Sequence, residues 1–189
     1  SLKDFFILYH SKEMVSGDFY WFSKVQHGTK DKFLVAAIDC TGHGVPGGFM
    51  SMIAHTLLSD IVGQKGIDEP KQILKELNDG MRSSLQQDER LMQDGMDIAI
   101  CSISYEGDNA RVLFSGARRP LIYIDKNMSE AQYLKGDKRS IGGLRAADAD
   151  SSFSDQELLL PKGSSIYLTS DGFAEQGSQS TGKIGTKQF

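Results

Sequence analysis

The sequence has little of what marks a secreted or zinc-stabilised protein. Its 189 residues include only two cysteines, Cys40 and Cys101, and neither lies in a CxxC or other zinc-binding spacing. A disulfide framework or a structural zinc site is therefore not expected. Each cysteine lies inside an apolar run, which fits a buried thiol in a reducing compartment. We predict a cytoplasmic protein.

An excess of positive charge is also lacking. Lys and Arg total 21 against 25 Asp and Glu, so the formal net charge is -4, and the basic residues are scattered along the chain. This excludes a basic face for phosphate backbones, so no nucleic acid is expected as a partner. No apolar run approaches the roughly 18 residues of a membrane span, and the first residues do not resemble a signal peptide. Any membrane contact would therefore lie outside these residues.

What the sequence does contain is sufficient for a hydrophobic core. Hydrophobic residues make up 39% of the chain and charged residues 24%, which is ordinary for a globular protein of this length. We predict a single domain over residues 1–189.

Strand patterns lie at both ends of the chain, and helix patterns lie between them. Residues 19–25 and 32–38 are rich in aromatic and β-branched side chains, which indicates a hairpin. Two helices are expected at 45–62 and 70–87, followed by strands at 96–105, 110–117, 120–126, 131–135 and 165–172, with a loose region over 142–155. The apolar positions at helical spacing are Phe49, Met52, Ile53, Leu57 and Ile61 in the first helix and Ile73, Leu74, Leu77, Met81 and Leu85 in the second. Strands segregated from helices predict an α+β fold with antiparallel sheets.

Three acids end or interrupt apolar strands beside a glycine: Asp18 in SGDFYW, Asp39 in AAIDCTGHG and Asp171 in YLTSDGFAE. Any one of them alone is best explained as a turn residue. Together they are harder to explain in that way, because an acid at the end of an apolar strand must be hydrated, paired or bound to a metal. Mg²⁺ and Mn²⁺ take carboxylates, backbone carbonyls and waters as ligands, and glycines let the backbone approach closely. The pattern favours a divalent-metal site.

A set of motifs in the same order resembles a known family. The segments SGDFYWF, AAIDCTGHGVPGGFMSMI, DGMDIAICSI, FSGARRPLIYI, IGG and YLTSDGFAEQ resemble the SpoIIE-type (sporulation-phosphatase) branch of the PPM family, the metal-dependent serine/threonine phosphatases related to protein phosphatase 2C. The resemblance covers the chain from about residue 16 to the end and implies an αββα sandwich, with two antiparallel sheets between pairs of helices. It also implies that Asp39 bridges two Mn²⁺ or Mg²⁺ ions beside the main-chain carbonyl of Cys40. Asp18 would then serve the second ion, partly through water, and Asp171 the first.

The resemblance also implies an activity and partners. Asp18, Asp39 and Asp171 would be the catalytic residues of a protein serine/threonine phosphatase, in which a metal-activated water attacks phosphoserine or phosphothreonine without a phosphoenzyme. Relatives of this branch act on small anti-sigma-factor antagonists, usually as the output domain of a longer bacterial signalling chain. A phosphorylated antagonist and sensor or receiver domains are therefore the expected partners, and a homodimer is left open. The two helices would act as a switch, because repacking them moves the DCTGHG loop.

The sequence departs from the family pattern at its end and leaves several roles open. The family's further acid, usually in a DD pair after SDG, has no counterpart before GKIGTKQF. This predicts a domain truncated at the C-terminus that holds its metals poorly, with a loosely packed tail over 177–185. Asp97 is either the substitute ligand or a structural acid. For Arg118, Arg119 and His43 we favour solvated or loop roles over contacts with phosphate, proton donation or metal binding.

Two other functions remain open. An aspartyl-phosphate-forming phosphatase also carries a DxTG segment with a nucleophilic Asp, but Thr41 stands where its second Asp would be, and antiparallel strands do not fit its parallel fold. The second alternative is a catalytically weak or inactive regulatory module of the same fold that binds a phosphoprotein. The intact Asp18, Asp39 and Asp171 argue against it, and the missing last acid leaves it open.

Overall fold

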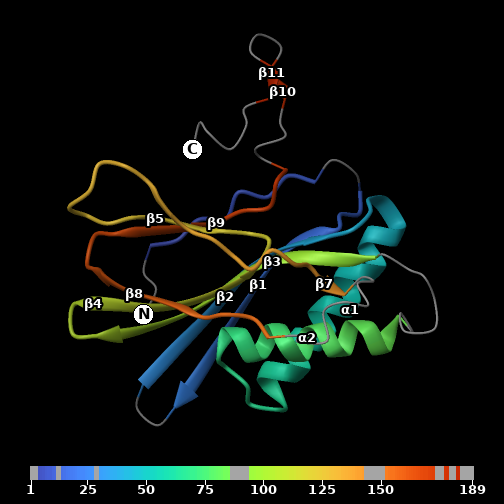
Figure 1. Cartoon of the computed structure of the whole chain (residues 1–189), viewed down its shortest axis with the longest axis horizontal. Helices are drawn as coiled ribbons and strands as arrows, with labels where there is room; N and C mark the ends of the chain where they lie inside the picture. Colours follow the sequence, from blue (N-terminus) through green and yellow to red (C-terminus); the bar gives the residue numbers. More distant parts are fainter. Residues whose placement is uncertain are drawn as a thin grey trace.

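The order of the elements is that of the sequence pattern, with two helices between two groups of strands (Figure 1). The computed structural model describes residues 4–11, 14–27, 30–85, 94–142, 152–172, 177–178 and 182–183. Its elements are β1 (Asp18–His27), β2 (Lys30–Cys40), α1 (Gly44–Gly63), α2 (Pro70–Ser84), β3 (Gly95–Glu106), β4 (Asn109–Ala117), β5 (Leu121–Ile124), β6 (Gln132–Leu134), β7 (Ile141–Gly142), β8 (Gln156–Pro161), β9 (Ser165–Leu168), β10 (Gly177–Ser178) and β11 (Gly182–Lys183). The short strands β7, β10 and β11 and the strand β8 have no counterpart among the predicted strands. The predicted loose region and tail fall mostly outside the described residues.

Two antiparallel sheets form the centre of the fold. The larger sheet has the strand order β1-β2-β3-β4-β8, with β7 pairing the start of β3, and the smaller sheet has the order β6-β5-β9. The ladders between these strands are antiparallel. The predicted α+β class with antiparallel sheets is therefore confirmed. The strands β10 and β11 pair separately.

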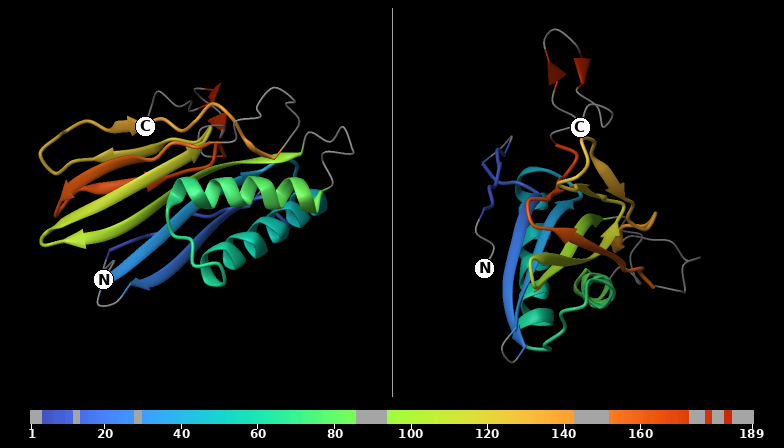
Figure 2. Two further views of the ribbon diagram at one scale, coloured as in Figure 1. Left: turned by 60° about the horizontal axis from the view of Figure 1, so that its bottom comes forward. Right: turned by 90° about the vertical axis from the view of Figure 1, so that its left-hand side faces the viewer.

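The helices and the smaller sheet cover opposite faces of the larger sheet (Figure 2). Because side chains alternate along a strand, β2 sends Leu34 and Ile38 to the helices and Phe33 to the smaller sheet. Between the sheets, Phe114 of β4 is fully buried together with Leu121 of β5. The described residues thus form three layers of an αββα arrangement, a pair of helices and two sheets.

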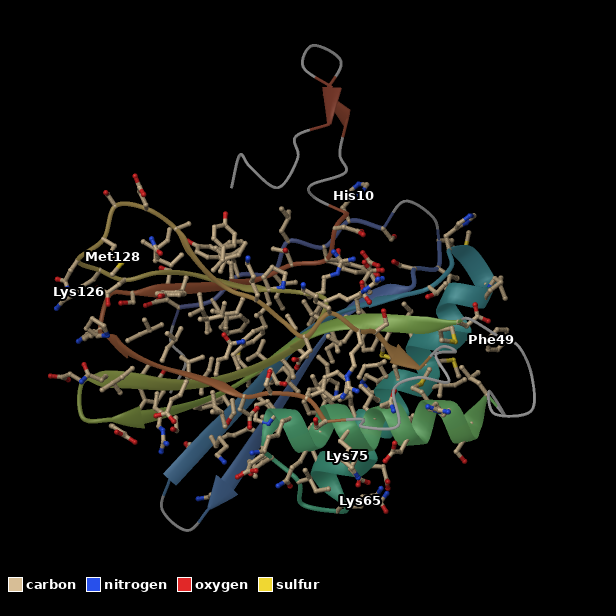
Figure 3. All side chains as sticks on the ribbon, in the orientation of Figure 1. His10, Phe49, Lys65, Lys75, Lys126 and Met128 are labelled. Atoms are coloured by element: carbon tan, nitrogen blue, oxygen red, sulfur yellow. The ribbon has the colours of Figure 1, made fainter. Side chains whose placement is uncertain are left out.

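The two helices differ in how well their buried faces follow from the sequence. Four of the five residues of the predicted face of α2 are fully buried: Ile73, Leu74, Leu77 and Met81. The fifth, Leu85, is the C-cap residue after Ser84 and is partly buried against the same core, whereas residues 86–87 lie outside the described part. The predicted face of α1 is wrong at two positions. Phe49 and Met52 are 60% and 66% exposed, and Figure 3 shows Phe49 at the outer edge of the molecule beside α1. The buried residues of α1 are Gly47, Met50, Ala54, Leu58, Ile61 and Val62.

The helix α1 is apolar on most of its circumference, which explains the wrong assignment. Asp60 is its one acid, and it contains no Lys or Arg. By length and composition alone it is long and apolar enough to cross a membrane, contrary to the expectation that no apolar run approaches that length. In this fold α1 packs against α2 and the larger sheet, with 33% of the apolar stretch buried. Length and composition alone are weak grounds for a membrane span.

Candidate metal and catalytic site

Three acids lie side by side at one end of the larger sheet. The strand register pairs Asp18 of β1 with Asp39 of β2, and Asp39 with Asp97 of β3. Directly paired residues of antiparallel strands point to the same face, with Cβ atoms about 4.5–5.5 Å apart. Phe33 of β2 and Cys101 of β3, at matching positions in the alternation, are buried between the sheets. The three carboxyl groups therefore face the side on which the smaller sheet lies.

A fourth acid reaches this row from the smaller sheet. Asp171 follows β9, which ends at Leu168. A single guanidinium nitrogen, Arg119 Nη2, donates a hydrogen bond to Asp39 Oδ2 and another, of 2.8 Å, to Asp171 Oδ2. The neighbouring Gly172 lies beside Asp18, because a Cβ built on it would be 3.6 Å from Asp18 Oδ2. The structure thus brings Asp18, Asp39 and Asp171 together.

Arg119 is the cation among these acids. Its side chain is 15% exposed, and its Nε lies 3.9 Å from Asp97 Oδ2. Burial acts to lower the pKa of the guanidinium, but the hydrogen bond to Asp171 and the charges of Asp39, Asp171 and Asp97 outweigh burial and raise this pKa, so Arg119 stays charged. The favoured solvated role is therefore wrong for Arg119. The neighbouring Arg118 is exposed, as expected.

Negative charge exceeds positive charge in this cluster. Burial raises the pKa of Asp39 to about 7, with a further contribution from the charge of Asp18, an opposing one from Arg119 and a smaller one from Asp171. When all four carboxyl groups are ionised, four negative charges against one guanidinium leave an excess of three negative charges. Such an excess of oxygen donors is what a hard divalent cation such as Mg²⁺ or Mn²⁺ neutralises.

The donor set therefore fits a divalent cation in its chemistry. Among the residues that the structure describes, no group of three or more His, Cys, Asp or Glu side chains is spaced to hold an ion. The guanidinium of Arg119 lies between Asp39, Asp97 and Asp171. The acids and the arginine form one charged cluster.

Glycines pack the loop after β2 against β1. Gly42 has a φ of 95°, a conformation that non-glycine residues seldom adopt. A Cβ on Gly17 would be 2.8 Å from the carbonyl oxygens of Cys40 and Gly42, and a Cβ on Gly47 would be 2.6 Å from the Gly42 oxygen. These glycines leave room for neighbouring backbone. As a result, the Cys40 carbonyl lies beside Gly17, next to Asp18.

Hydrogen bonds connect the loop and Asp97 to the strands around them. The Thr41 N–H donates to the Gly95 carbonyl at 2.8 Å, and the Gly95 N–H donates to Thr41 Oγ1 at 3.2 Å. Ser140 Oγ donates to Asp97 Oδ1 at 2.5 Å. Asp97 therefore lies in the acid row and also has a structural partner. His43 is the exposed N-cap residue of α1 and makes no side-chain cap hydrogen bond.

Comparison with known proteins identifies the family. The model of the family described as stage II sporulation protein E (SpoIIE) matches residues 29–189. The chain belongs to the SpoIIE family. This is a family of PP2C-type, metal-dependent serine/threonine phosphatases, as the motifs predict. A comparison with curated proteins found no match.

Solved structures agree with the SpoIIE-family assignment. The SiaA-PP2C domain of Pseudomonas aeruginosa shares 31% identity with a TM-score of 0.79, over 97% of this chain and 68% of that one. RsbX in complex with magnesium shares 16% identity with a TM-score of 0.59, over 86% and 69%. The PP2C phosphatase domain of SpoIIE from Bacillus subtilis, solved with a fragment of its regulatory domain, shares 24% identity with a TM-score of 0.61, over 88% and 44%. The last two likenesses show the fold alone.

In this SpoIIE-family domain, Arg119 is the site residue whose place the sequence does not predict. Asp18, Asp39 and Asp171 stand out in the sequence because each ends or interrupts an apolar strand beside a glycine. Arg119 lies in a comparable place, between the end of β4 at Ala117 and the start of β5 at Leu121. The sequence does show a charged residue between two apolar strands. This pattern indicates a site less strongly than an acid beside glycine does, because an arginine at the rim of a sheet is commonly solvated.

Proposed function

We propose that this SpoIIE-family domain hydrolyses phosphoserine and phosphothreonine in protein substrates with Mn²⁺ or Mg²⁺. The observation that carries the proposal is the meeting of four carboxylates from two stacked sheets beside a glycine-packed loop. Two ions bound there would supply an acidified water and neutralise the phosphoryl oxygens. The metal-holding groups would be Asp18, Asp39 and Asp171 together with the main-chain carbonyl of Cys40.

The positions of Asp39 and Asp171 suit a metal site that acts on a protein substrate. Asp39 lies between Asp18 and Asp97 in the strand register, so it is the carboxylate best placed to be shared by two ions. The exposed fraction rises from 18% for the side chain of Asp39 to 51% for that of Asp171. The acid cluster is therefore open to solvent on the side of Asp171. A phosphate group on another protein could reach it from that side.

Phosphate release from a phosphoserine or phosphothreonine peptide in Mn²⁺ tests the proposal. We expect release that stops on chelation and that falls to background in Asp39→Asn. Asp108→Asn is the matched control, because Asp108 is an exposed acid in the turn between β3 and β4. Activity that survives exhaustive chelation, or an Asp39→Asn variant as active as the wild type, would refute the proposal.

We also propose a cytoplasmic signalling role, as the output domain of a longer bacterial chain that acts on a phosphorylated anti-sigma-factor antagonist. The support is the resemblance to the SpoIIE branch and the regulatory domain that accompanies the similar phosphatase domain in Bacillus subtilis SpoIIE. Screening phosphorylated antagonist domains against the full-length protein tests this role. Exclusive activity on small metabolite phosphates would contradict it.

The competing function is a regulatory module that binds a phosphoprotein without cleaving it. Such a module would bind a phosphorylated partner in Mn²⁺ and release no phosphate. An aspartyl-phosphate mechanism would instead leave an acid-stable, hydroxylamine-sensitive phosphoenzyme, and the antiparallel ladders around Asp39 weigh against it. The same peptide assay, with the protein itself checked for bound phosphate, separates the three functions.

A further inference from the structure

We propose that Arg119 is an exchangeable counter-ion of the acid cluster, which a divalent cation must displace from Asp39 and Asp171 in order to bind. The inference rests on the proposed metal site, because it concerns the same carboxylates. It adds a residue that sets how tightly the site takes up metal. Arg119 would act through the acids, as a positioning residue, without contact to the reacting atoms.

The competition follows from the atoms involved. Arg119 Nη2 uses Asp39 Oδ2 and Asp171 Oδ2, which belong to the two carboxylates that come from different sheets. A cation held by both sheets needs oxygens of the same two groups. A cation can bind only to molecules in which Arg119 has left these carboxylates. The observed affinity is therefore the intrinsic affinity multiplied by the fraction of such molecules. Arg119 would therefore weaken metal binding without being a ligand.

The geometry of Arg119 is that of a loosely satisfied ion pair. One nitrogen, Nη2, serves two carboxylates, while Nε is buried and has no hydrogen-bond partner in the part of the chain that the structure describes. Arg111 shows the contrasting case, because its Nε and Nη2 bind the two oxygens of Glu157 at 2.8 and 2.9 Å. A guanidinium pairs best in that bidentate form. Arg119 thus neutralises part of the charge of the acid cluster without forming a bidentate ion pair.

The backbone of Arg119 is held in place, so only its side chain needs to move. A Cβ on Gly116 would be 2.4 Å from the Arg119 carbonyl oxygen, and a Cβ on Gly136 would be 2.6 Å from it. The Arg119 N–H also donates to the Ala117 carbonyl at 2.8 Å. Displacement would therefore swing the guanidinium out of the cluster while its point of attachment stays at the edge of the site.

Isothermal titration calorimetry of the whole chain with Mn²⁺ tests the inference. We expect Arg119→Gln to bind Mn²⁺ at least about tenfold more tightly than the wild type, because about tenfold corresponds to a single charge-assisted hydrogen bond and the wild type has to break two, to Asp39 and Asp171. Arg118→Gln is the matched control, since it removes the same charge from the exposed neighbouring residue and should leave the affinity unchanged. Arg119→Lys keeps the charge but not the fork of donors, so it should bind with intermediate affinity.

A thermal melt gives a second readout that does not depend on activity. Mn²⁺ should raise the melting temperature of Arg119→Gln by more than it raises that of the wild type, because tighter binding to the folded state gives more stabilisation. Arg119→Lys carries the test if Arg119→Gln does not fold. Wild-type Mn²⁺ binding with equal or weaker binding in the Arg119 variants overturns the inference and leaves the phosphatase proposal standing. Absence of Mn²⁺ binding in every protein overturns both.

Discussion

Two glycines of α1 provide a paired test of how the DCTGHG loop is packed. Gly47 lies in the first turns of the helix, and Gly63 is its last residue. The same substitution, glycine to alanine, should have opposite effects on the free energy of unfolding at the two positions. At Gly63 a Cβ would meet no atom within 4 Å, whereas at Gly47 it would be 2.6 Å from the Gly42 carbonyl oxygen.

The expected magnitudes follow from these distances. Alanine is favoured over glycine inside a helix by about 1 kcal/mol, so Gly63→Ala at the helix end should be stabilising by roughly 0.5 kcal/mol. Real Cβ atoms essentially never come closer than 3.0 Å to another heavy atom, and a Cβ on Gly47 would be 0.4 Å inside that limit. The atoms that it would meet belong to the backbone of Gly42 and Gly17, which cannot move aside as a flexible side chain can. Overpacking of this kind costs about 1–3 kcal/mol. With the propensity gain subtracted from the upper end of that range, Gly47→Ala should lose about 2 kcal/mol.

Urea denaturation of the two variants and the wild type measures these changes. The midpoint should fall for Gly47→Ala and rise slightly for Gly63→Ala, with the slope of the transition unchanged in both. Mn²⁺ titration of Gly47→Ala should also show weaker binding, because relief of the contact moves the loop that carries the Cys40 carbonyl. A Gly47→Ala variant as stable as Gly63→Ala would refute the reasoning, since helix propensity alone would then explain both.

Three further predictions concern the core and the surroundings of the site. Phe114→Ala should destabilise the domain by about 3–5 kcal/mol in denaturant, because the fully buried ring fills space between the sheets; a loss below about 1 kcal/mol would mean that the sheets close over the gap. Cys101, whose pKa burial raises to about 12, should react with a disulfide reagent at pH 8 only as fast as the protein unfolds. Because the pKa is higher in the folded state, this thiol's contribution to stability should be lost as pH rises from about 9 toward 12, and Cys101→Ala should flatten that decline; an identical alkaline profile would contradict it. Ser140→Ala removes the hydroxyl that donates to Asp97 at 2.5 Å and should cost about 1–2 kcal/mol, whereas an unchanged midpoint would mean that water replaces the hydroxyl.

The spacing of apolar residues predicts the buried face of a helix well when only one side of the helix is apolar. The helix α2 has apolar side chains on one side and charged ones such as Lys75 on the other, and four of its five predicted core residues are fully buried. Lys65 and Lys75 lie at the solvent side of the helical layer (Figure 3), where they pair with Glu76 and Asp79. The helix α1 has no such contrast. Its buried face is decided by where α2 and the larger sheet lie, which spacing alone does not reveal.

The candidate site likewise contains residues that the local sequence indicates and residues that only the tertiary fold places. Strand-end acids beside glycine are visible in the sequence, so Asp18, Asp39 and Asp171 could be named together. The position of Asp97 depends on the register of β3 against β2, and that of Arg119 on the stacking of one sheet over the other. Arg119 and Asp39 are 80 residues apart in sequence. Contacts of such separation come from the tertiary fold and leave little local trace.

The in-register pairing of Asp18 with Asp39 ties the chemistry of one face to the packing of the other. Along β1, Trp21 is buried under the helices while Asp18 faces the smaller sheet. A slip of one residue between β1 and β2 would turn every side chain of the slipped strand to the opposite face. It would remove Trp21 from the core at the same moment as it removes Asp18 from the acid row. The packing of the hydrophobic layer therefore selects the register that the site needs, because a hairpin in the wrong register loses core burial as well as the acid row.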